Sequence, residues 1–488
     1  MKPAGNNAGI VIIGAGFAGL CMAIRLKQAG FDDFVILEKN DDLGGTWRDN
    51  QYPGCACDVP SHLYSFSFEL NPRWSAMFAP QQEIWAYLRR CTDKYALGPH
   101  IRYGCAVERM EWDDTAGRWR VATAAGDAYT ARAIVSGIGA LHVPSVPEVP
   151  GADRFTGPSF HSAQWDAACD LSGKRVAVVG TGASAIQFIP EIAKRARQVY
   201  VFQRTPPWIH PRPDFEIPPA VRTAFAAVPP VMRAFRDAIY GMLELRAAGF
   251  ALHPAFMAPL QRMAERLIER QIDDPALRAK VTPDYTIGCK RILLSSAYYP
   301  ALTRSNVELV TEPISEINQT GLACSGGRGY DVDAIIYGTG FKTVDALTEL
   351  NVAGRGGVKL ADAWRDGVAA YFGMTVAGFP NFFMLLGPNT GLGHNSVVFM
   401  IECQVRHVLS CLRLLAAGRA DTIEVRAPVS DRFNDRIQRR LRRSVWSQGG
   451  CTSWYLDADG VNRALWPGFS FEYWARTRQA RRADYMIG

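Results

Sequence analysis

The sequence predicts an α/β fold with two Rossmann-like dinucleotide-binding domains and a helical insertion. One apolar segment runs into the glycine-rich turn Gly14-Ala15-Gly16-Phe17-Ala18-Gly19, and another runs into Gly180-Thr181-Gly182-Ala183-Ser184-Ala185. Such a turn between a strand and a helix lets a pyrophosphate reach the helix N-terminus. Two units in one chain predict two dinucleotides, as in a flavoenzyme that takes hydride from a nicotinamide.

The first unit has the sequence context that such a turn needs. An amphipathic run at 20–29 stops at Gly30, and a short apolar strand follows at 34–37. Glu38 ends that strand 19 residues after Gly19, where a carboxylate accepts hydrogen bonds from an unphosphorylated adenosine ribose. A solvated acid at a strand end is the alternative that we consider less favoured.

The second unit differs at the corresponding position. Its second strand, at 198–202, is followed by Gln203, Arg204 and Thr205, with no acid. A cation and a hydroxyl there favour a ribose 2′-phosphate, and hence NADPH over NADH. Lys290 is a second candidate for this contact, and a surface role for Arg204 is the alternative.

Composition and charge agree with a large enzyme that binds no nucleic acid and has no membrane span. Of 488 residues 48% are apolar, and the net charge is +7, from 54 basic and 47 acidic residues. The short arginine cluster at 439–443 and the pair at 481–482 are typical of solvated helix faces. Residues 368–401 contain no Asp, Glu, Lys or Arg, as a membrane span would. Pro380 and the glycine-rich segment at 387–393 interrupt this stretch, so the sequence predicts a buried strand, a loop and the start of a helix instead. The N-terminal sequence resembles no signal peptide, so we expect a cytoplasmic protein.

Eleven cysteines show no paired spacing typical of a metal site. Cys55 and Cys57 with His62 come nearest, but no second Cys or His pair accompanies them. We therefore expect small buried thiols and no metal.

The positions of these segments predict the domain organisation. A proline-rich connector lies at 143–150, and amphipathic helical patterns dominate 213–285. We expect residues 1–143 and 372–488 to form the first dinucleotide domain, residues 144–212 and 286–371 the second, and residues 213–285 a helical insertion.

A motif between the two turns makes a family resemblance specific. Phe155, Gly157, His161, Trp165 and Asp166 follow the pattern F-x-G-x-x-x-H-x-x-x-W-D, which resembles the fingerprint of type I Baeyer–Villiger monooxygenases. Further matches extend along nearly the whole chain: Gly44-Gly45-Thr46-Trp47, Tyr52-Pro53-Gly54-Cys55-Ala56-Cys57-Asp58, Cys289-Lys290-Arg291 and Ser453-Trp454-Tyr455. Each residue alone suits a packing role, but this order of matches favours the family.

The resemblance implies FAD in the first domain and NADPH in the second. It implies conversion of ketones to esters or lactones with O2 through a C4a-peroxyflavin, and sulfoxidation as a possible side activity. The implied FAD contacts are Gly14, Gly16, Phe17, Ala18, Gly19, Glu38, Lys39, Gly45, Thr46, Trp47, Asp58, Val59, Tyr64 and Val107. The implied NADPH contacts are Gly180, Thr181, Gly182, Ala183, Ser184, Arg204, Thr205 and Lys290.

Two residues match the catalytic pair of the family. Arg291 matches the catalytic arginine and Asp58 its acidic partner beside the flavin. A permanently protonated arginine suits the chemistry, because it stabilises developing negative charge without giving up a proton. A structural salt bridge between domains is the alternative.

The segment from Gly387 to Glu402 is most similar to the branch that includes 4-hydroxyacetophenone monooxygenase. Asn395 or Ser396 is expected to cap the helix that follows. His394 and Trp454 are candidates for the substrate pocket, although His394 also suits a structural role. The particular ketone and the oligomeric state are left open.

Three other functions remain possible at this stage. An N-hydroxylating or flavin-containing monooxygenase shares both turns but typically lacks the Trp165-Asp166 pair. A disulfide reductase needs flavin-adjacent cysteines at another spacing than that of Cys55 and Cys57. A non-enzymatic NADPH-sensing module would not need the matches in the first domain.

Overall fold

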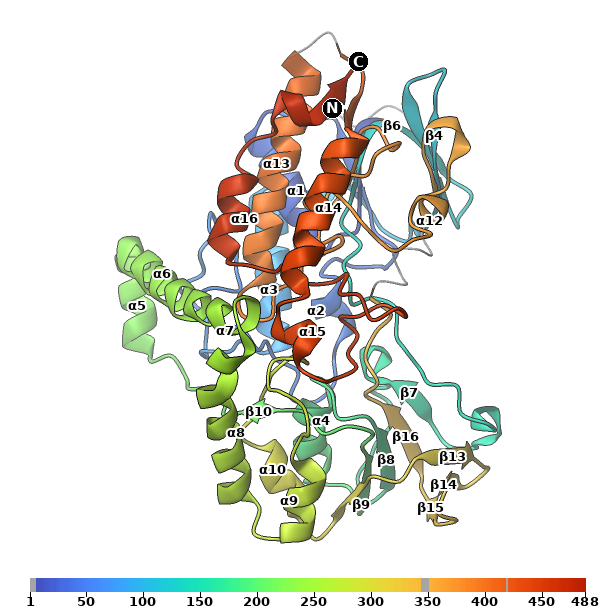
Figure 1. Cartoon of the computed structure of the whole chain (residues 1–488), viewed down its shortest axis with the longest axis vertical. Helices are drawn as coiled ribbons and strands as arrows, with labels where there is room; N and C mark the ends of the chain where they lie inside the picture. The colour runs from blue at the N-terminus through green and yellow to red at the C-terminus, as the bar shows by residue number, and fades with distance from the viewer. Residues whose placement is uncertain (1–5, 344–350, 418–419) are drawn as a thin grey trace.

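The computed structural model, which describes residues 6–343, 351–417 and 420–488, has the predicted α/β architecture. Two separate sheets form the upper and lower halves of the molecule in Figure 1, each accompanied by helices. The chain leaves the upper sheet, builds the lower one and the helices beside it, and then returns to the upper sheet. None of the helices in the described ranges is long and apolar enough to cross a membrane.

The upper sheet carries the first glycine-rich turn. Its strand β1 (Asn7–Ile13) pairs in parallel with β2 (Phe34–Leu37) and β6 (Ala128–Ser136). Side chains of β1 alternate between two cores, with Ile12 on one face and Val11 on the other. Burial on both faces explains why the strand is apolar after the exposed Asn7. The other strands of this sheet are β3 (Ile101–Arg102), β4 (Val107–Asp113), β5 (Arg118–Thr123), β17 (Asn351–Ala353) and β18 (Phe382–Met384).

Helices from both ends of the chain cover one face of the upper sheet. Helix α1 (Phe17–Gln28) follows the turn and packs against α13 (Val397–Ala417). Ser396 begins α13 as its cap, since its Oγ accepts a hydrogen bond from Val398 N at 3.3 Å, as the sequence predicted. The other helices of this half are α2 (Thr46–Asp49), α3 (Gln81–Lys94), α12 (Leu360–Ala363), α14 (Ala427–Leu441), α15 (Val445–Gln448) and α16 (Ser470–Arg476).

The lower sheet is parallel throughout and carries the second turn. Its strands run in the order β12 (Val307–Val310), β9 (Gln198–Phe202), β8 (Arg175–Val179), β16 (Ala334–Tyr337) and β7 (Ser159–His161). Helix α4 (Ala185–Ile192) follows the turn and packs against α10 (Tyr298–Leu302). Smaller sheets pair β10 (Ile209–His210) with β11 (Leu293–Leu294), β14 (Gly321–Cys324) with β13 (Ile314–Ile317) and β15 (Gly329–Asp331), and β19 (Ile423–Val425) with β20 (Tyr485–Ile487).

Strand β17 changes where one proposed domain boundary is drawn. The sequence placed residues 286–371 in the second domain, but β17 pairs in parallel with β4 of the upper sheet. Leu360 and Trp364 also pack in the core on that sheet's outer face. A three-residue edge strand has too weak a sequence signal to be assigned to a sheet in advance. We therefore propose that the second domain ends before Asn351.

The predicted helical insertion contains α5 (Pro219–Ala227), α6 (Pro229–Leu245), α7 (Ala247–Ala251), α8 (Ala258–Gln271) and α9 (Pro275–Val281). Helices α5 and α6 extend to the left of the body in Figure 1. Arg236 on α6 attaches them to the upper half, because its buried Nη1 donates to the carbonyls of His62 (2.6 Å) and Leu63 (3.1 Å). The His62 ring packs edge-on against Phe225 of α5 and Phe235 of α6.

Replacing His62 with Phe is expected to make folding less sensitive to acid. Burial, assisted by neighbouring Arg236, lowers the pKa of His62 to about 4. An unfolded histidine titrates near pH 6.5, so below that pH the unfolded chain binds a proton that the folded chain does not. Neutral His62 therefore contributes its full share to the free energy of unfolding above about pH 6.5. That share falls as the pH is lowered toward 4, and about 2 kcal/mol of it is lost at pH 5.

Urea unfolding at pH 7.5 and pH 5 measures this difference. The parent should lose more stability between the two pH values than His62→Phe does. His253→Asn, at an exposed histidine, is the matched control and should behave like the parent. Equal losses in the parent and His62→Phe would contradict the assignment.

Candidate active site

The first glycine-rich turn leaves its helix N-terminus available to an anion. A Cβ on Gly19 would lie 1.8 Å from the carbonyl oxygen of Gly14, so only glycine fits and the helix closes tightly on the strand. No side chain caps α1, whose N-cap is Gly16. The backbone N–H groups of Phe17 and Ala18 therefore lie in the uncapped first turn, where a pyrophosphate binds in such folds.

Glu38 lies at the rim of the same turn. Its buried carboxylate accepts hydrogen bonds from Ala15 N at 2.7 Å and from Asn40 N at 3.0 Å. The carbonyl of Glu38 also accepts from Cys105 N at 2.8 Å, which brings the start of β4, with Val107, to this end of the sheet. The backbone thus fixes the carboxylate in position, and each oxygen keeps a lone pair for a ribose hydroxyl.

Aromatic side chains gather beside this turn. Trp47 of α2, which follows Gly45 and Thr46, donates from Nε1 to the Tyr64 hydroxyl at 3.1 Å. The Tyr64 ring meets the Phe17 ring edge-on, with centroids 5.1 Å apart. Burial raises the pKa of Tyr64 far above its usual value, so this hydroxyl stays protonated.

The second turn repeats the uncapped arrangement. Gly180 has a φ of 103°, and a Cβ there would lie 2.6 Å from the carbonyl oxygen of Gly338, so the position needs glycine. Helix α4 begins after Ser184 without a side-chain cap. Thr181 Oγ1 donates to the carbonyl of Thr205 at 3.4 Å and so joins the turn to the segment after β9.

Two cations meet at the end of β9. Burial lowers the pKa of Lys290, and the nearby positive charge of Arg204 lowers it further. The Lys290 ammonium also lies 5.1 Å from the centre of the Tyr285 ring. The carboxylate of Asp284 partly offsets this lowering of the Lys290 pKa. Two like charges close together are favourable to an added anion, so the pair fits a phosphate group.

Arg291 and Asp58 join the two halves of the molecule. Arg291 Nε and Nη2 donate to one oxygen of Asp58, Oδ2, at 2.9 and 2.6 Å. About a third of the arginine side chain (33%) and 27% of the aspartate side chain are exposed. The negative charge of Asp58 raises the pKa of Arg291, so the guanidinium stays protonated at every physiological pH.

Tyr455 is a site residue that sequence reasoning did not single out. Its hydroxyl is buried and makes no hydrogen bond of ordinary geometry among the described residues. Burial raises its pKa to about 12, with the charge of Arg291 and a weak hydrogen bond from it opposing the shift and Asp58 reinforcing it, so the hydroxyl lies close to both charges. A buried polar atom beside the ion pair fits a site that receives a polar ligand. In the sequence, the family match at residues 453–455 was the feature that pointed to this segment.

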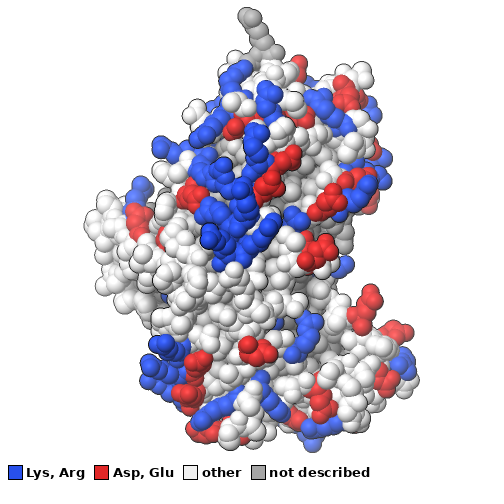
Figure 2. All heavy atoms as spheres, viewed as in Figure 1, with Lys and Arg blue, Asp and Glu red and all other residues white. Residues whose placement is uncertain are grey.

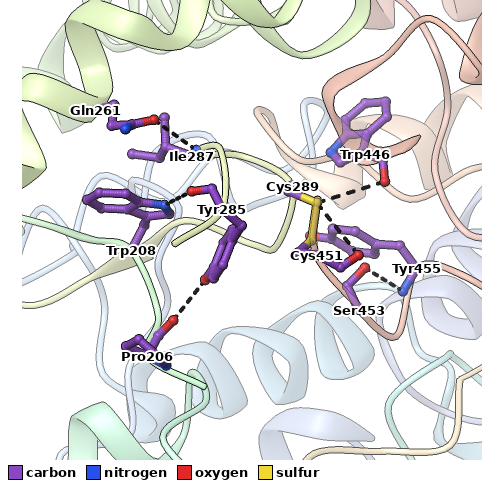
Figure 3. Close-up of a disulfide and its surroundings, with 10 residues drawn as sticks. All are labelled: Pro206, Trp208, Gln261, Tyr285, Ile287, Cys289, Trp446, Cys451, Ser453 and Tyr455. Atoms are coloured by element: carbon purple, nitrogen blue, oxygen red, sulfur yellow. Dashed lines mark hydrogen bonds between the residues drawn. A yellow bond between two sulfur atoms is a disulfide. The ribbon is translucent and has the colours of Figure 1, made fainter. Parts of the chain in front are cut away.

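A disulfide between Cys289 and Cys451 corrects the expectation that all cysteines are free thiols. Figure 3 shows it between the loop before Arg291 and the loop that carries Ser453 and Tyr455. The two cysteines are 162 residues apart, so no spacing rule could pair them. The other nine are free, and all but Cys169 are buried. Burial raises the pKa of Cys55 to about 12, which argues against a reactive thiol near Asp58.

A glutamine holds the segment before Asp58 on the lower half. Gln187 of α4 accepts from the Tyr52 hydroxyl at 3.0 Å and donates to the carbonyl of Ala56 at 3.0 Å. The Tyr52 ring also packs edge-on against Phe188. These contacts fix the approach of Asp58 to Arg291.

The fingerprint residues lie where the connector meets the lower sheet. Phe155 packs on the lower core, and Gly157 precedes β7. His161 ends β7, and its buried Nδ1 accepts from Ala163 N at 3.1 Å. Burial lowers the pKa of His161, so the ring is neutral, with its proton on Nε2. Trp165 contacts the rings of Phe160 and Phe188.

A cavity of 670 Å³ separates the two halves near these residues. Lys39 and Arg48 line it from the upper half, and Gln164, Trp165 and Phe341 line it from the lower half. The exposed Lys39 thus lies beside the seam between the two halves, next to Glu38.

The predicted pocket residues His394 and Trp454 lie in different surroundings. His394 is buried, and its Nε2 lies 3.5 Å from Oε2 of Glu244, a carboxylate of the insertion. Glu244 also accepts from Asn395 Nδ2 and Ser470 Oγ, both at 2.7 Å. Burial alone would raise the pKa of Glu244, but contacts with His394, Ser470 and Asn395 lower it to about 2. Trp454, by contrast, is 45% exposed beside Tyr455.

Comparisons with known proteins agree with this geometry. A family profile described as "Pyridine nucleotide-disulphide oxidoreductase" matches residues 11–234. A Baeyer-Villiger monooxygenase of Pseudomonas aeruginosa is 51% identical over 99% of this chain and 92% of that protein. The solved structure of an oxidized steroid monooxygenase bound to NADP is similar, with a TM-score of 0.88, 32% identity and 99% of each chain covered. A structure of OTEMO in complex with FAD and NADP has a TM-score of 0.89, 26% identity and 99% coverage of both chains.

The predictions of an FAD- and NADPH-dependent monooxygenase and of its two cofactors are therefore confirmed, in preference to an N-hydroxylating enzyme or a binding module. The chain belongs to the Baeyer-Villiger monooxygenase family, whose members convert ketones to esters or lactones with O2.

Proposed function

We propose that Arg291 supplies the fixed positive charge on which oxygenation of a ketone depends. The observation that carries the proposal is its paired contact with Asp58, 2.6 and 2.9 Å long, which leaves a third of the arginine side chain exposed. Bound FAD, once reduced by NADPH, activates O2 for the reaction. Negative charge then develops on the carbonyl oxygen of the ketone, and a cation already in place stabilises it without reorganisation.

Asp58 acts as a positioning residue for this arginine. Because Asp58 engages only Nε and one N–H of Nη2, the remaining N–H groups of the guanidinium stay available to substrate. The carboxylate also offsets part of the cost of removing the guanidinium from water, which the two thirds of the side chain that are covered entail. The buried Tyr455 hydroxyl, close to both charges, adds a polar group to the same site.

The fit of each cofactor to its turn supports the proposed contacts. The uncapped helices at residues 14–19 and 180–185 suit the two pyrophosphates, and Glu38 suits the FAD ribose. Arg204 and Lys290 suit the 2′-phosphate of NADPH because their positive charges lie close enough to act on each other. Trp47 and Tyr64 supply apolar surface beside the first turn.

The substrate class stays a proposal. Trp454 is exposed enough to line a ketone pocket, whereas the contact of His394 with Glu244 favours a structural role for that histidine. Similarity to the 4-hydroxyacetophenone branch favours aryl ketones. Product analysis with acetophenone, 4-hydroxyacetophenone and cyclohexanone tests this, since an ester or lactone identifies the ketone accepted. Nine of the eleven cysteines are free thiols, which favours a cytoplasmic location, although the disulfide between Cys289 and Cys451 is of a kind that is rare there.

Replacing Arg291 with Ala is expected to abolish oxygenation while preserving the cofactors. FAD content and the rate of flavin reduction by NADPH should stay close to parental values. Ester formation should fall by about 10²–10³-fold, the usual effect of losing a preorganised donor to a developing oxyanion. Stopped-flow absorbance follows the flavin, and ester and hydrogen peroxide are quantified in the same reaction.

Arg175→Ala is the matched control for that experiment. Arg175 forms a comparable ion pair with Asp333 at 2.9 Å, with 37% of its side chain exposed, at the far end of β8. The Arg175→Ala variant should form ester at the parental rate. A parental rate of ester formation in Arg291→Ala would refute the role given to Arg291 and, with it, that of Asp58.

Replacing Arg204 with Ala is expected to weaken the preference for NADPH over NADH. A charge-assisted contact contributes about 1.5–3 kcal/mol, or one to two orders of magnitude in affinity. Michaelis constants for both nucleotides measure the ratio. Arg197→Ala removes an exposed arginine just before β9 and should leave the ratio unchanged. An unchanged ratio in Arg204→Ala would remove Arg204 from the phosphate contact.

Replacing Cys451 with Ser is expected to loosen the loop that holds Tyr455 beside Arg291. Loss of a disulfide that closes a long loop costs about 2–4 kcal/mol of stability. Thermal unfolding should therefore occur at lower temperature in Cys451→Ser, and dithiothreitol should shift the parent in the same direction. Cys169→Ser, at a free thiol, is the control. A parent protein with eleven free thiols by mass spectrometry would contradict the bridge.

A further inference from the structure

Helix α6 of the insertion exposes much apolar surface while it buries two charges. A helix on the surface of a protein normally turns its apolar face to the core and its charges to water. In α6 the apolar Met232, Ile239 and Leu243 are buried as expected, but the charged Arg236 and Glu244 are buried with them. Besides the charged Arg233 and Asp237, the exposed side of the helix carries Val231, Ala234, Ala238, Gly241, Met242 and Leu245.

The buried charges fix this orientation. Arg236 donates to backbone carbonyls at 62 and 63, and Glu244 accepts from Asn395 and Ser470. Rolling the helix to bury the exposed apolar residues would expose Ile239 and Leu243 and leave two charges without partners, which is far more costly than leaving a few apolar side chains in water. The exposed apolar residues are therefore a fixed feature of the folded protein.

The apolar surface continues beyond α6. Val221 and Val228 on the α5 side and Leu252 and Phe256 beyond α7 are exposed as well. Phe471 of α16 is adjacent, because its N–H donates to Glu244 at 3.3 Å, and it is 52% exposed. We call this surface the apolar lobe: Val221, Val228, Val231, Met242, Leu245, Leu252, Phe256 and Phe471.

Figure 2 shows the lobe as a largely white projection on the left. In the segment 219–256, all of which is described, the exposed charged side chains are Arg233, Asp237 and Arg246. Contiguous apolar surface of this kind marks an interaction site in proteins.

Exposed arginines flank the lobe. In Figure 2 a band of blue side chains runs over α14 beside the white projection. The exposed members on α14 and just after it are Arg432, Arg436, Arg439, Arg442 and Arg443. Arg440 connects the band to the lobe, since it pairs at 2.7 Å with Glu472, the neighbour of Phe471. The sequence alone favoured a solvated face for these arginines, and the structure adds the apolar neighbour.

We propose that the apolar lobe docks on an anionic lipid membrane without crossing it. Apolar side chains next to arginines are the pattern of proteins that lie at a membrane surface, where the apolar groups enter the acyl boundary and the guanidinium groups contact lipid phosphates. The projecting shape of α5 and α6 in Figure 1 suits a deformable bilayer. A second copy of the chain would have to offer a matching apolar surface and would leave the arginines beside the lobe unexplained.

Vesicle flotation of the complete, FAD-loaded protein tests the proposal. Vesicles of phosphatidylcholine and phosphatidylglycerol in a 7:3 ratio should carry the protein to the top of the gradient, and vesicles of phosphatidylcholine alone should carry much less. High salt should reduce binding to the anionic vesicles, because it screens the arginines. Failure to float with anionic vesicles at low salt would overturn the proposal.

Paired variants assign the binding to the lobe. Val231→Glu with Met242→Glu should lower vesicle affinity by about tenfold or more, since two inserted side chains are replaced by charges. Arg439→Glu with Arg443→Glu should lower affinity for anionic vesicles and remove its dependence on salt. Val358→Glu places the same charge at another 50% exposed valine, outside the lobe, and should bind like the parent. NADPH oxidation with ketone should stay at the parental rate in all three.

Light scattering after size exclusion separates lipid from a second copy. A parent monomer that binds vesicles through the lobe supports the proposal. A dimer that Val231→Glu with Met242→Glu dissociates, without vesicle binding by the parent, would show that the lobe is a self-interface and would overturn it. Equal vesicle binding by that variant and the parent would overturn it as well.

Discussion

The contact between Asp58 and Arg291 requires the two halves of the molecule to keep one relative orientation. The residues are 233 positions apart in the chain, yet their atoms must meet at 2.6 to 2.9 Å. A partly exposed ion pair contributes little to stability, typically about 0–1 kcal/mol. The pair therefore cannot hold the halves together, and the packing around it must set the orientation that the pair then uses.

That packing is distributed along the seam between the halves. The main core is continuous across it and includes Ile12 of the upper sheet and Phe188 of α4. Gln187 fixes the backbone just before Asp58, and the disulfide at Cys289 fixes the backbone just before Arg291. Each partner of the ion pair thus has its own local restraint. The guanidinium can be positioned before substrate arrives, which is the condition for electrostatic stabilisation at low reorganisation cost.

Local sequence carried enough information for the turns and for the residues that touch them. The glycines at 14 and 180, Glu38 at the end of β2 and the cap at Ser396 each depend on neighbours within a few residues, so a pattern can reveal them. Arg291 and Asp58 were found only because their surrounding segments match a family. Contacts that depend on distant packing escaped prediction: Cys289 with Cys451, β17 on the upper sheet, and Tyr455 beside the ion pair. Nothing in either segment specifies the partner, which the tertiary fold alone brings near.

Helix α6 shows a different limit of sequence reasoning. Its periodicity correctly predicts an amphipathic helix, but periodicity states only that two faces differ and not which of them is buried. Here Arg236 and Glu244 find partners in the upper half of the molecule, and those hydrogen bonds decide the orientation. These charges anchor the insertion together with the buried Ile239 and Leu243, whereas Val231, Met242 and Leu245 stay exposed. Buried, fully engaged charges can therefore decide which apolar residues of an amphipathic helix remain at the surface, and such residues are left available for docking.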